Sequence, residues 1–383
     1  MSITHKIAEW QRAGLLSAEA AAAILQHEER QSRPYLLYAA GGLGALTIVL
    51  GVVAIIASNW QDIPGGVKLA IDLLLASGVA AAIVLAERRG GAWLRELLIS
   101  IYYGFVLASI GLISQVYHLG GATWQALLAW SALTFVLVTR GRSAGLASAW
   151  IIGLHTTYYL GLEALVDGLG PGREGEALGV GLVSLPPLLC LIVAASASVA
   201  RWRPLYSRAF ARFGWSGALL LASAASFVLY DPPPAAPPRL LLLGAGVAAA
   251  LTGVLVVRAS KLVPGRPAAI TPTRVLLLLI LVLGYGPLLL ASEEQRLLAA
   301  LCFIALWAAA AWVGYAAHNV RVLNIATAVI GVRLITVYFE VFGSLLDTGL
   351  GLITGGLFTV GLTYLWARKR RDFAAHLAEE PKQ

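Results

Sequence analysis

The sequence predicts an all-α fold, a polytopic bundle of about twelve transmembrane helices, and three observations lead to this prediction. The 383 residues are 59% hydrophobic and only 13% charged, whereas a soluble domain is about 45–50% apolar and about 25% charged. The apolar residues gather in runs close to the roughly 20 residues that a helix needs to cross a bilayer. The basic residues gather in alternate connections between these runs, as the positive-inside rule describes.

The first 33 residues differ from the rest of the chain and predict a short helical hairpin. Apolar residues recur at helical spacing as far as Trp10, Gly14 interrupts the pattern, and Ser17 is a favourable N-cap for a second, alanine-rich helix. The hairpin over residues 1–33 is therefore expected in the cytoplasm, where it either docks a protein partner or lies on the membrane surface.

Twelve apolar segments then make up a predicted transmembrane bundle over residues 34–367, followed by a basic cytoplasmic tail over residues 368–383. The first segment is longer than the apolar core of a signal peptide, about 7–15 residues, so it is predicted to remain as a span. Several segments are short and the fifth could be partly re-entrant, so the predicted number of spans is ten to twelve. The segments are 35–57, 66–86, 97–117, 123–139, 144–161, 177–200, 213–230, 239–257, 273–291, 296–316, 322–342 and 348–367.

Lysine and arginine residues set the predicted orientation. If the N-terminus is inside, most of the 28 basic residues fall in cytoplasmic connections, and acidic residues collect on the opposite side. A miscounted span would reverse this alternation in every later connection, so both termini are predicted to be cytoplasmic. The same bias explains the isoelectric point of about 9.6 without a nucleic-acid partner. The use of arginine, alanine and glycine is typical of GC-rich bacteria, and the expected location is the bacterial cytoplasmic (inner) membrane.

Ionisable side chains within a span cost about 2.5–3.5 kcal/mol each on insertion scales and are functional candidates by default. Asp72 lies in the second predicted span, whereas Arg333 and Glu340 share one face of the eleventh. We expect Arg333 to pair with Glu340 or with Asp72, either as a structural ion pair or as part of a functional site. Asn324, near the inner end of the same span, is expected to hydrogen-bond to a neighbouring helix.

A second group of polar side chains falls at the predicted outer ends of the spans, namely Asn59, Asp62, Gln115 and His118. One interpretation is a polar cavity that opens outward. The other is an interfacial belt, because the tryptophan and tyrosine residues at the same ends, Tyr158 and Tyr159 among them, favour the membrane–water interface in any case. The aromatic residues favour the belt, and the polar ones are compatible with both.

Two stretches are expected to interrupt spans. The pair Pro186-Pro187 lies inside the sixth segment, and the stretch from Gly284 to Pro287 lies near the outer end of the ninth. Proline removes a backbone donor and kinks a helix, and broken spans often line the substrate cavities of transporters. Membrane helices also tolerate proline as a plain kink, which is the favoured interpretation here.

The chain carries none of the motifs of nucleotide binding, zinc peptidases, serine hydrolases or dinucleotide binding. Its two cysteines, Cys190 and Cys302, each lie inside an apolar run, which predicts burial rather than a disulfide framework or a metal site. No cofactor and no metal is therefore expected, and the lipid bilayer is the partner that the composition requires.

Four short stretches are specific through their order and spacing, namely Trp10 with Gly14-Leu15-Leu16-Ser17, Ala57-Ser58-Asn59-Trp60, Gln115-Val116-Tyr117-His118, and a tail with Asn324, Arg333, Tyr338-Phe339, Asp347 and Gly355-Gly356. Together they resemble the bacterial predicted integral membrane proteins of domain-of-unknown-function family 2157. The resemblance is clearest over about residues 1–140 and 319–370. It implies the multi-span architecture and the membrane location, and it implies no activity.

Three functional hypotheses remain. The first is a secondary carrier or permease-like protein for a small solute, which the span count, the intramembrane charges and the interrupted helices favour, although the two halves show no internal repeat. The second is a non-transporting membrane scaffold or sensor whose cytoplasmic hairpin binds a protein partner. The third and least favoured is a membrane-embedded enzyme that acts at the outer face, with Asp72 or Glu340 as general acid or base.

Overall fold

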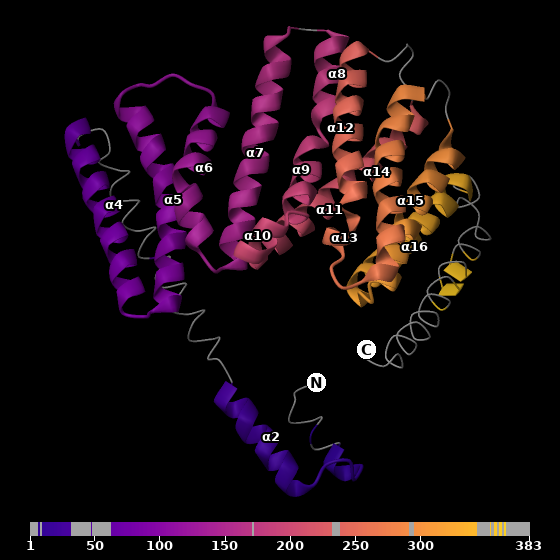
Figure 1. Ribbon diagram of the computed structural model, residues 1–383, viewed down its shortest axis with the longest axis horizontal. Helices are drawn as coiled ribbons and strands as arrows, with labels where there is room; N and C mark the ends of the chain where they lie inside the picture. Colours follow the sequence, from indigo (N-terminus) through magenta and orange to yellow (C-terminus); the bar gives the residue numbers. More distant parts are fainter. Residues whose placement is uncertain are drawn as a thin grey trace. The chain divides into compact units, whose positions relative to one another are not determined.

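The computed structural model describes residues 10–31, 63–170, 172–231, 238–290 and 295–342, together with the single positions 7, 47, 353, 356, 357, 360, 361 and 364. Every regular element within these residues is a helix (Figure 1). The all-α prediction is therefore confirmed for this part of the chain. The chain forms two compact units, Met1–Ile71 and Asp72–Gln383.

In the first unit, a glycine separates two helical stretches. Gly14 has a φ of +71°, a left-handed conformation that glycine adopts without a steric cost. Helix α2 (Ala18–Gln31) begins after Ser17, whose hydroxyl accepts a hydrogen bond from the Ala20 N–H at 3.1 Å. The predicted interruption at Gly14 and the predicted N-cap at Ser17 are both confirmed.

The second unit is a bundle in which helices close in sequence also pack together, as α6 does with α7, α14 with α15, and α15 with α16. Other pairings link more distant segments, among them α8 with α12 and α11 with α14, and α9 packs against α11 across the short α10. The helices are α4 (Gly65–Arg88), which begins in the first unit, α5 (Ala92–Val116), α6 (Thr123–Arg140), α7 (Ala144–Gly168), α8 (Arg173–Leu182), α9 (Leu185–Ala194), α10 (Ala197–Trp202), α11 (Pro204–Ser226), the 3-10 helix η1 (Phe227–Tyr230), α12 (Arg239–Val257), α13 (Ala259–Leu262), η2 (Pro267–Ala269), α14 (Ile270–Leu290), α15 (Arg296–Ala316) and α16 (Val320–Phe342).

Eight helical segments of the described chain are long and apolar enough to cross a membrane. They correspond to α4, α5, α8 with α9, α11 with η1, α12, η2 with α14, α15 and α16. The first and twelfth predicted spans fall outside the described residues, except for single positions. The fourth and fifth correspond to α6 and α7, which have the length of a span but a more polar sequence, with Gln125 and His155 among their residues. The predicted total of twelve spans is therefore not confirmed.

Helix α7 bears on the expectation that the fifth segment is partly re-entrant. It runs without a break over 25 residues, which at 1.5 Å per residue is about 37 Å, more than the roughly 30 Å of a hydrocarbon core. A re-entrant segment would turn back before reaching this length. The continuous helix therefore favours a full crossing.

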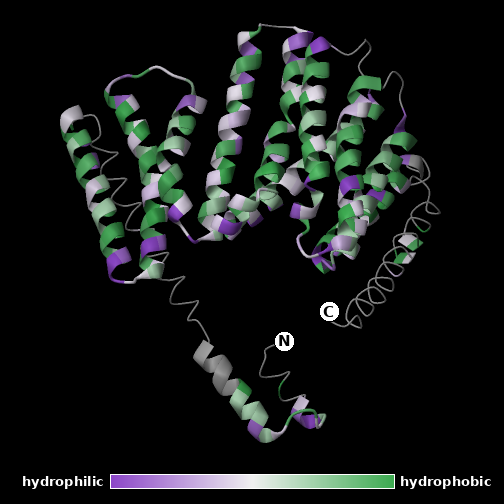
Figure 2. Ribbon diagram, viewed as in Figure 1, coloured by the Kyte–Doolittle hydropathy of each residue, from purple (hydrophilic) through white to green (hydrophobic). Residues whose placement is uncertain are grey.

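Large apolar side chains point away from the bundle along its helices. Leu74 is 73% exposed, Leu243 62% and Leu297 69%, and Figure 2 shows hydrophobic residues along the helices with hydrophilic residues gathered near the connections. Such apolar surface is far larger than the patches that soluble monomers expose. The bundle is accordingly a membrane protein with several apolar helices in contact with lipid.

The connections of the second unit divide between its two ends. Figure 1 shows the α4–α5, α6–α7 and α12–α14 connections at one end and the α5–α6 and α7–α8 connections at the other. Arg88 and Arg89, Arg140 and Arg142, and Lys261 lie at the first end. The alternation of basic connections that the sequence predicts is therefore seen in space as one basic end.

The sixth predicted span, 177–200, differs from its prediction. Helix α8 ends at Leu182, a turn follows, and α9 begins with Pro186 and Pro187 in its first turn, where a missing N–H costs least. The span ends at Ala194, and α10 is a separate short helix. The predicted interruption is confirmed as a two-residue break at Val183 and Ser184, and because both residues keep right-handed helical backbone angles, the break has the form of the favoured kink. The predicted end of this span is wrong by six residues.

The ninth predicted span is not interrupted. Helix α14 continues through Pro287 to Leu290, because a membrane helix tolerates an internal proline when its neighbours stabilise it. The interruption expected from Gly284 to Pro287 is therefore wrong as secondary structure. The same stretch nevertheless packs against the break between α8 and α9, as its hydrogen bonds show.

Candidate functional site

The break between α8 and α9 leaves backbone carbonyl groups without helical partners. In an α-helix the N–H of residue i bonds to the carbonyl of residue i−4, so Pro186 and Pro187 leave the carbonyls of Leu182 and Val183 free. The helical pattern resumes only at Leu188, whose N–H bonds to the Ser184 carbonyl at 3.3 Å. A free carbonyl in a membrane interior is costly unless another donor reaches it.

Two neighbouring tyrosines of α7 supply these donors. The Tyr158 hydroxyl donates to the Leu182 carbonyl at 2.9 Å, and the Tyr159 hydroxyl donates to the Val183 carbonyl at 3.2 Å. The sequence favours an interfacial belt for these aromatic residues, and that interpretation misses their role at the break. Consecutive tyrosines opposite consecutive prolines are the signal that could have suggested it.

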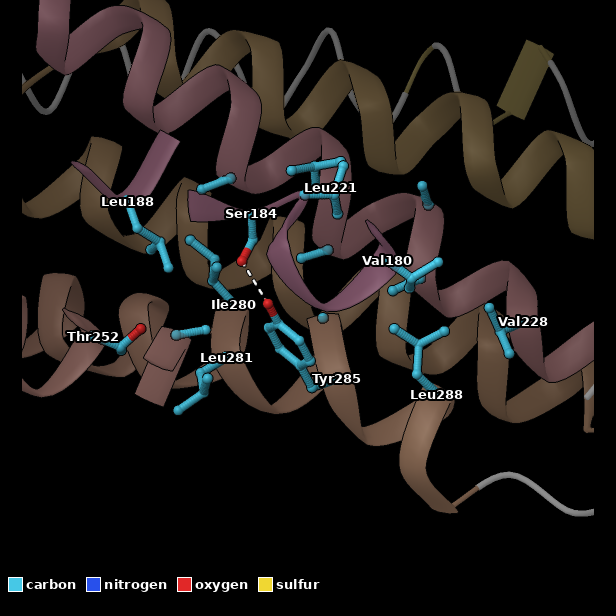
Figure 3. Close-up of a pocket in the computed structure, with 17 residues that line it drawn as sticks. Val180, Ser184, Leu188, Leu221, Val228, Thr252, Ile280, Leu281, Tyr285 and Leu288 are labelled. Atoms are coloured by element: carbon cyan, nitrogen blue, oxygen red, sulfur yellow. Dashed lines mark hydrogen bonds between the residues drawn. The ribbon is translucent and has the colours of Figure 1, made fainter. Parts of the chain in front are cut away.

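A third tyrosine, Tyr285 of α14, reaches the same break from the other side. Its hydroxyl donates to the Gly181 carbonyl at 2.6 Å and lies 2.6 Å from the Ser184 hydroxyl, which is therefore placed to donate to it (Figure 3). The close approach of α8 to α12 fixes this geometry. A Cβ atom on Gly244 would lie 2.5 Å from the Gly181 backbone, so only glycine fits at this crossing.

A cavity of about 290 Å³ lies beside this break, between α8, α9, α11, α12 and α14. Figure 3 shows its labelled apolar residues, among them Val180 and Ile280, around the hydroxyls of Ser184, Tyr285 and Thr252. The Thr252 hydroxyl is buried and has no hydrogen-bond partner among the described residues. No charged side chain lines the cavity. The space therefore suits an uncharged, mainly apolar molecule that offers a hydrogen-bonding group to Thr252.

The buried arginine of α16 lies in a second polar cluster. The Arg333 side chain is 4% exposed and forms an ion pair with Glu340 at 3.0 Å. The Tyr230 hydroxyl bridges the two, because it accepts from Arg333 and donates to the other Glu340 oxygen at 2.6 Å. Of the two acids considered from the sequence, Glu340 is the partner. Tyr230 lies 103 residues away, and no local pattern could have identified it.

Aromatic rings complete the surroundings of the Arg333 guanidinium. Its central carbon lies 5.0 Å from the ring centre of Phe227, 5.8 Å from that of Tyr230 and 5.7 Å from that of Phe303. Each ring face attracts a cation. One carboxylate, one hydroxyl and three rings therefore surround the charge, while the Arg333 Nε has no hydrogen-bond partner among the described residues.

The short helix η1 joins the cavity to the arginine cluster. Val228 lines the cavity, whereas Phe227 and Tyr230 of the same helix contact Arg333. A displacement of η1 would therefore change both sites. This is the physical connection between the neutral cavity and the buried charge.

The remaining intramembrane candidates lie elsewhere. Asp72 is buried in α4, where its carboxyl group lies 2.9 Å from the Ser109 hydroxyl of α5, and it does not pair with Arg333. The half-buried Asn324 side chain makes no hydrogen bond among the described residues, so the expected bond to a neighbouring helix stays a prediction. The Asn324 backbone carbonyl instead accepts from Thr327 at 3.1 Å.

The predicted outer cluster is only partly described. Asn59 and Asp62 lie outside the described residues. Gln115 and His118 are both exposed at the end of α5, where the His118 ring lies 2.8 Å from the Gln115 carbonyl. This contact is local and terminates the helix. Neither residue lines the cavity beside the break.

The comparisons with known proteins bear on the first part of the chain. Residues 8–147 match the family model described as predicted membrane protein (DUF2157). The family resemblance predicted from the sequence is therefore confirmed over this stretch, which extends from the hairpin to the start of α7. The break, its cavity and the Arg333 cluster all lie beyond it. No curated protein and no solved structure matches the chain.

Proposed function

We propose that the chain is a secondary carrier or permease-like protein for a small uncharged solute, and that the cavity beside the α8–α9 break is its binding site. The observation that supports this proposal most directly is a cavity at the point where a membrane-crossing segment is broken. Discontinuous helices line the substrate sites of many transporters. In this chain the Ser184 and Tyr285 hydroxyls lie at the break and line the cavity.

The chemistry of the cavity suggests the class of solute. Its volume of about 290 Å³ lies at the lower limit of ligand pockets, about 300–1,000 Å³. The three carbonyls at the break already accept from tyrosine hydroxyls, which leaves the Thr252 hydroxyl for a ligand. A charged solute would find no counter-charge there. A small alcohol, amide or phenol has the right balance of apolar and polar groups.

Arg333 and Glu340 have a supporting role in this proposal. Because η1 carries Val228 to the cavity and Tyr230 to the ion pair, loading of the cavity shifts the hydrogen bonds of the arginine cluster. When the cavity is empty, the hydrogen bonds of Tyr230 to Arg333 and Glu340 hold η1 in one position. Asp72, Asn324, Gln115 and His118 have no part in this mechanism.

Neighbouring leucines of α11 provide a matched test of the site. Leu221 lines the cavity, whereas Leu220 is 64% exposed on the lipid-facing side. Purified protein would be screened for solutes that raise its melting temperature, and uptake of each such solute would be measured in proteoliposomes. Leu221→Trp should abolish uptake, while Leu220→Trp should retain it. Equal uptake by both variants would exclude this cavity as the site.

We further propose twelve spans with both termini in the cytoplasm of a bacterial inner membrane. The support is the gathering of basic connections at one end of the second unit. Reporter fusions after residue 33 and after residue 371 should both report the cytoplasm, and fusions within residues 231–238 should report the outside. Opposite locations of the two termini would contradict the even number of spans.

A second candidate function, a scaffold or sensor, has one observation in its favour. The N-terminal hairpin exposes large apolar side chains, with Trp10 43% and Leu15 73% exposed, next to a well-defined turn. We propose that residues 1–33 dock a cytoplasmic protein through these side chains. A chain without residues 2–30 should still insert into the membrane, because the first span carries its own apolar run. Failure to insert would show that the hairpin belongs to the bundle.

The enzyme hypothesis has less support. It requires Asp72 or Glu340 to act as a general acid or base at the outer face. Asp72 bonds to Ser109, and Glu340 is already engaged by Arg333 and Tyr230. The two carboxyl groups belong to separate clusters, so they do not form the pair that general acid–base chemistry at one site would use.

A further inference from the structure

A second cavity, of about 440 Å³, lies among α6, α7, α9, α10 and α11. It is larger than the cavity beside the break and is not part of the proposed solute site. Most of its walls are apolar or aromatic side chains, among them Phe135, Trp150, Leu154, Leu189, Val193 and Phe210. A space of this size and composition suits a hydrocarbon chain.

One mouth of this cavity is positively charged. Arg203, between α10 and α11, lines it, and the Nε of this side chain is buried without a hydrogen-bond partner among the described residues. The guanidinium lies 5.3 Å from the ring centre of Trp202, which also lines the cavity. A buried donor without a partner costs free energy, and an acceptor at this position would remove that cost.

The start of α11 adds to this charge. Arg203 is the N-cap residue of α11, Pro204 follows it, and no side chain caps the helix. The first N–H groups of a helix carry a partial positive charge and bind anions. Because Arg203 is both a lining residue and the N-cap of α11, the guanidinium and the helix end attract a negative group on the same side of the cavity.

The neighbouring Arg201 shows that this arrangement is specific to Arg203. The Arg201 side chain is exposed, and its Nε donates to the Ala197 carbonyl of its own helix at 3.2 Å. It does not line the cavity. Two arginines separated by one residue thus differ in burial, in hydrogen bonding and in access to the apolar space.

We propose that this cavity binds an anionic phospholipid, with one acyl chain among the apolar side chains and the phosphate at Arg203 and the start of α11. Basic pockets between membrane helices recognise lipid headgroups through the same combination of charge and apolar surface. A free phosphate would gain nothing from the apolar walls. A phospholipid with a choline headgroup would bring a second positive charge towards Arg203 and should bind less well.

Native mass spectrometry of the detergent-purified full chain tests this proposal. The probes are phosphatidylglycerol, phosphatidylcholine with the same acyl chains, and soluble glycerol phosphate. We expect retention of one phosphatidylglycerol, weaker retention of phosphatidylcholine, and no retention of glycerol phosphate. Arg203→Gln should weaken phosphatidylglycerol binding at least about tenfold through the lost charged hydrogen bond, and Arg201→Gln should leave it unchanged.

A second variant separates the role of the cavity from that of the charge. Val193→Phe narrows the apolar space without removing an arginine, and it should also weaken phosphatidylglycerol binding. Equal binding by Arg203→Gln and Arg201→Gln would overturn the proposal in favour of a nonspecific basic surface. Retention of glycerol phosphate alone would overturn it in favour of a simple anion site. Unfolding temperatures of the variants, measured without added lipid, would show whether each remains folded.

Discussion

The α8–α9 break and the Arg333 cluster place polar groups inside the same bundle in two different ways. At the break, three carbonyls each receive one hydroxyl, from Tyr158, Tyr159 and Tyr285. At the cluster, one guanidinium receives a carboxylate, a hydroxyl and three aromatic rings. The difference follows from charge, because a carbonyl dipole is satisfied by a single donor, whereas an arginine keeps its full charge.

The two regions also differ in what a lost partner leaves behind. Loss of a tyrosine hydroxyl leaves a neutral carbonyl without a donor, which costs about 1–3 kcal/mol. Loss of Glu340 leaves a buried cation, which costs more. The predictions below test this ranking, from the largest expected effect to the smallest.

The largest effect is expected at the Arg333–Glu340 pair. Glu340→Leu should lower the free energy of unfolding by about 3 kcal/mol, the lower end of the range for a broken buried pair, because the Glu340 side chain is 28% exposed. Arg333→Leu should cost less, since the remaining carboxyl group can take up a proton. The double variant should recover stability relative to Glu340→Leu. Unfolding of the detergent-purified variants measures all three, and purely additive losses would argue against the pair.

An intermediate effect is expected at the break. Tyr158→Phe and Tyr159→Phe should each destabilise the protein by about 1–2 kcal/mol, because each leaves one carbonyl without its donor. Tyr102→Phe is the matched control, since the Tyr102 hydroxyl has no hydrogen-bond partner among the described residues, and it should change little. The same unfolding assay applies. A loss as large for Tyr102→Phe would show that the ring and its surroundings, not the hydrogen bond, determine the cost.

A smaller effect is expected at Asp72, the other buried ionisable residue discussed above. Asp72→Asn keeps the size of the side chain and a group that can bond to Ser109. The expected loss is below about 1 kcal/mol, far less than for Glu340→Leu. A loss of unfolding free energy as large as that of Glu340→Leu would instead show that Asp72 balances a positive charge.

The smallest effect on stability is expected at Thr252. Its hydroxyl has no partner among the described residues, so Thr252→Val removes an unsatisfied group and should leave the unfolding temperature unchanged or slightly higher. The same variant should weaken binding of any solute that the cavity takes. A marked loss of stability would show that the hydroxyl has a partner in the membrane.

Part of this arrangement could be predicted from short stretches of sequence. The composition required a bilayer, Gly14 and Ser17 marked the turn and cap of the hairpin, and Pro186-Pro187 located the break. Arg333 and Glu340 lie two helical turns apart on one face, so their pairing also followed from helix geometry. These are consequences of covalent structure and helical period, which act over a few residues.

The partners from distant segments were decided only by the tertiary structure. The donors at the break come from α7 and α14, Tyr230 reaches Arg333 from η1, and both cavities lie between helices far apart in sequence. Such contacts depend on how each helix is rotated and how closely it approaches its neighbour, as at the Gly181–Gly244 crossing. The sequence alone determined a membrane bundle, the position of the break at Pro186-Pro187, and the intramembrane charges Asp72, Arg333 and Glu340. The packing of helices decided which hydroxyls bond to the carbonyls at the break and to the Arg333 guanidinium. Such partners depend on distances between helices, which no local pattern contains.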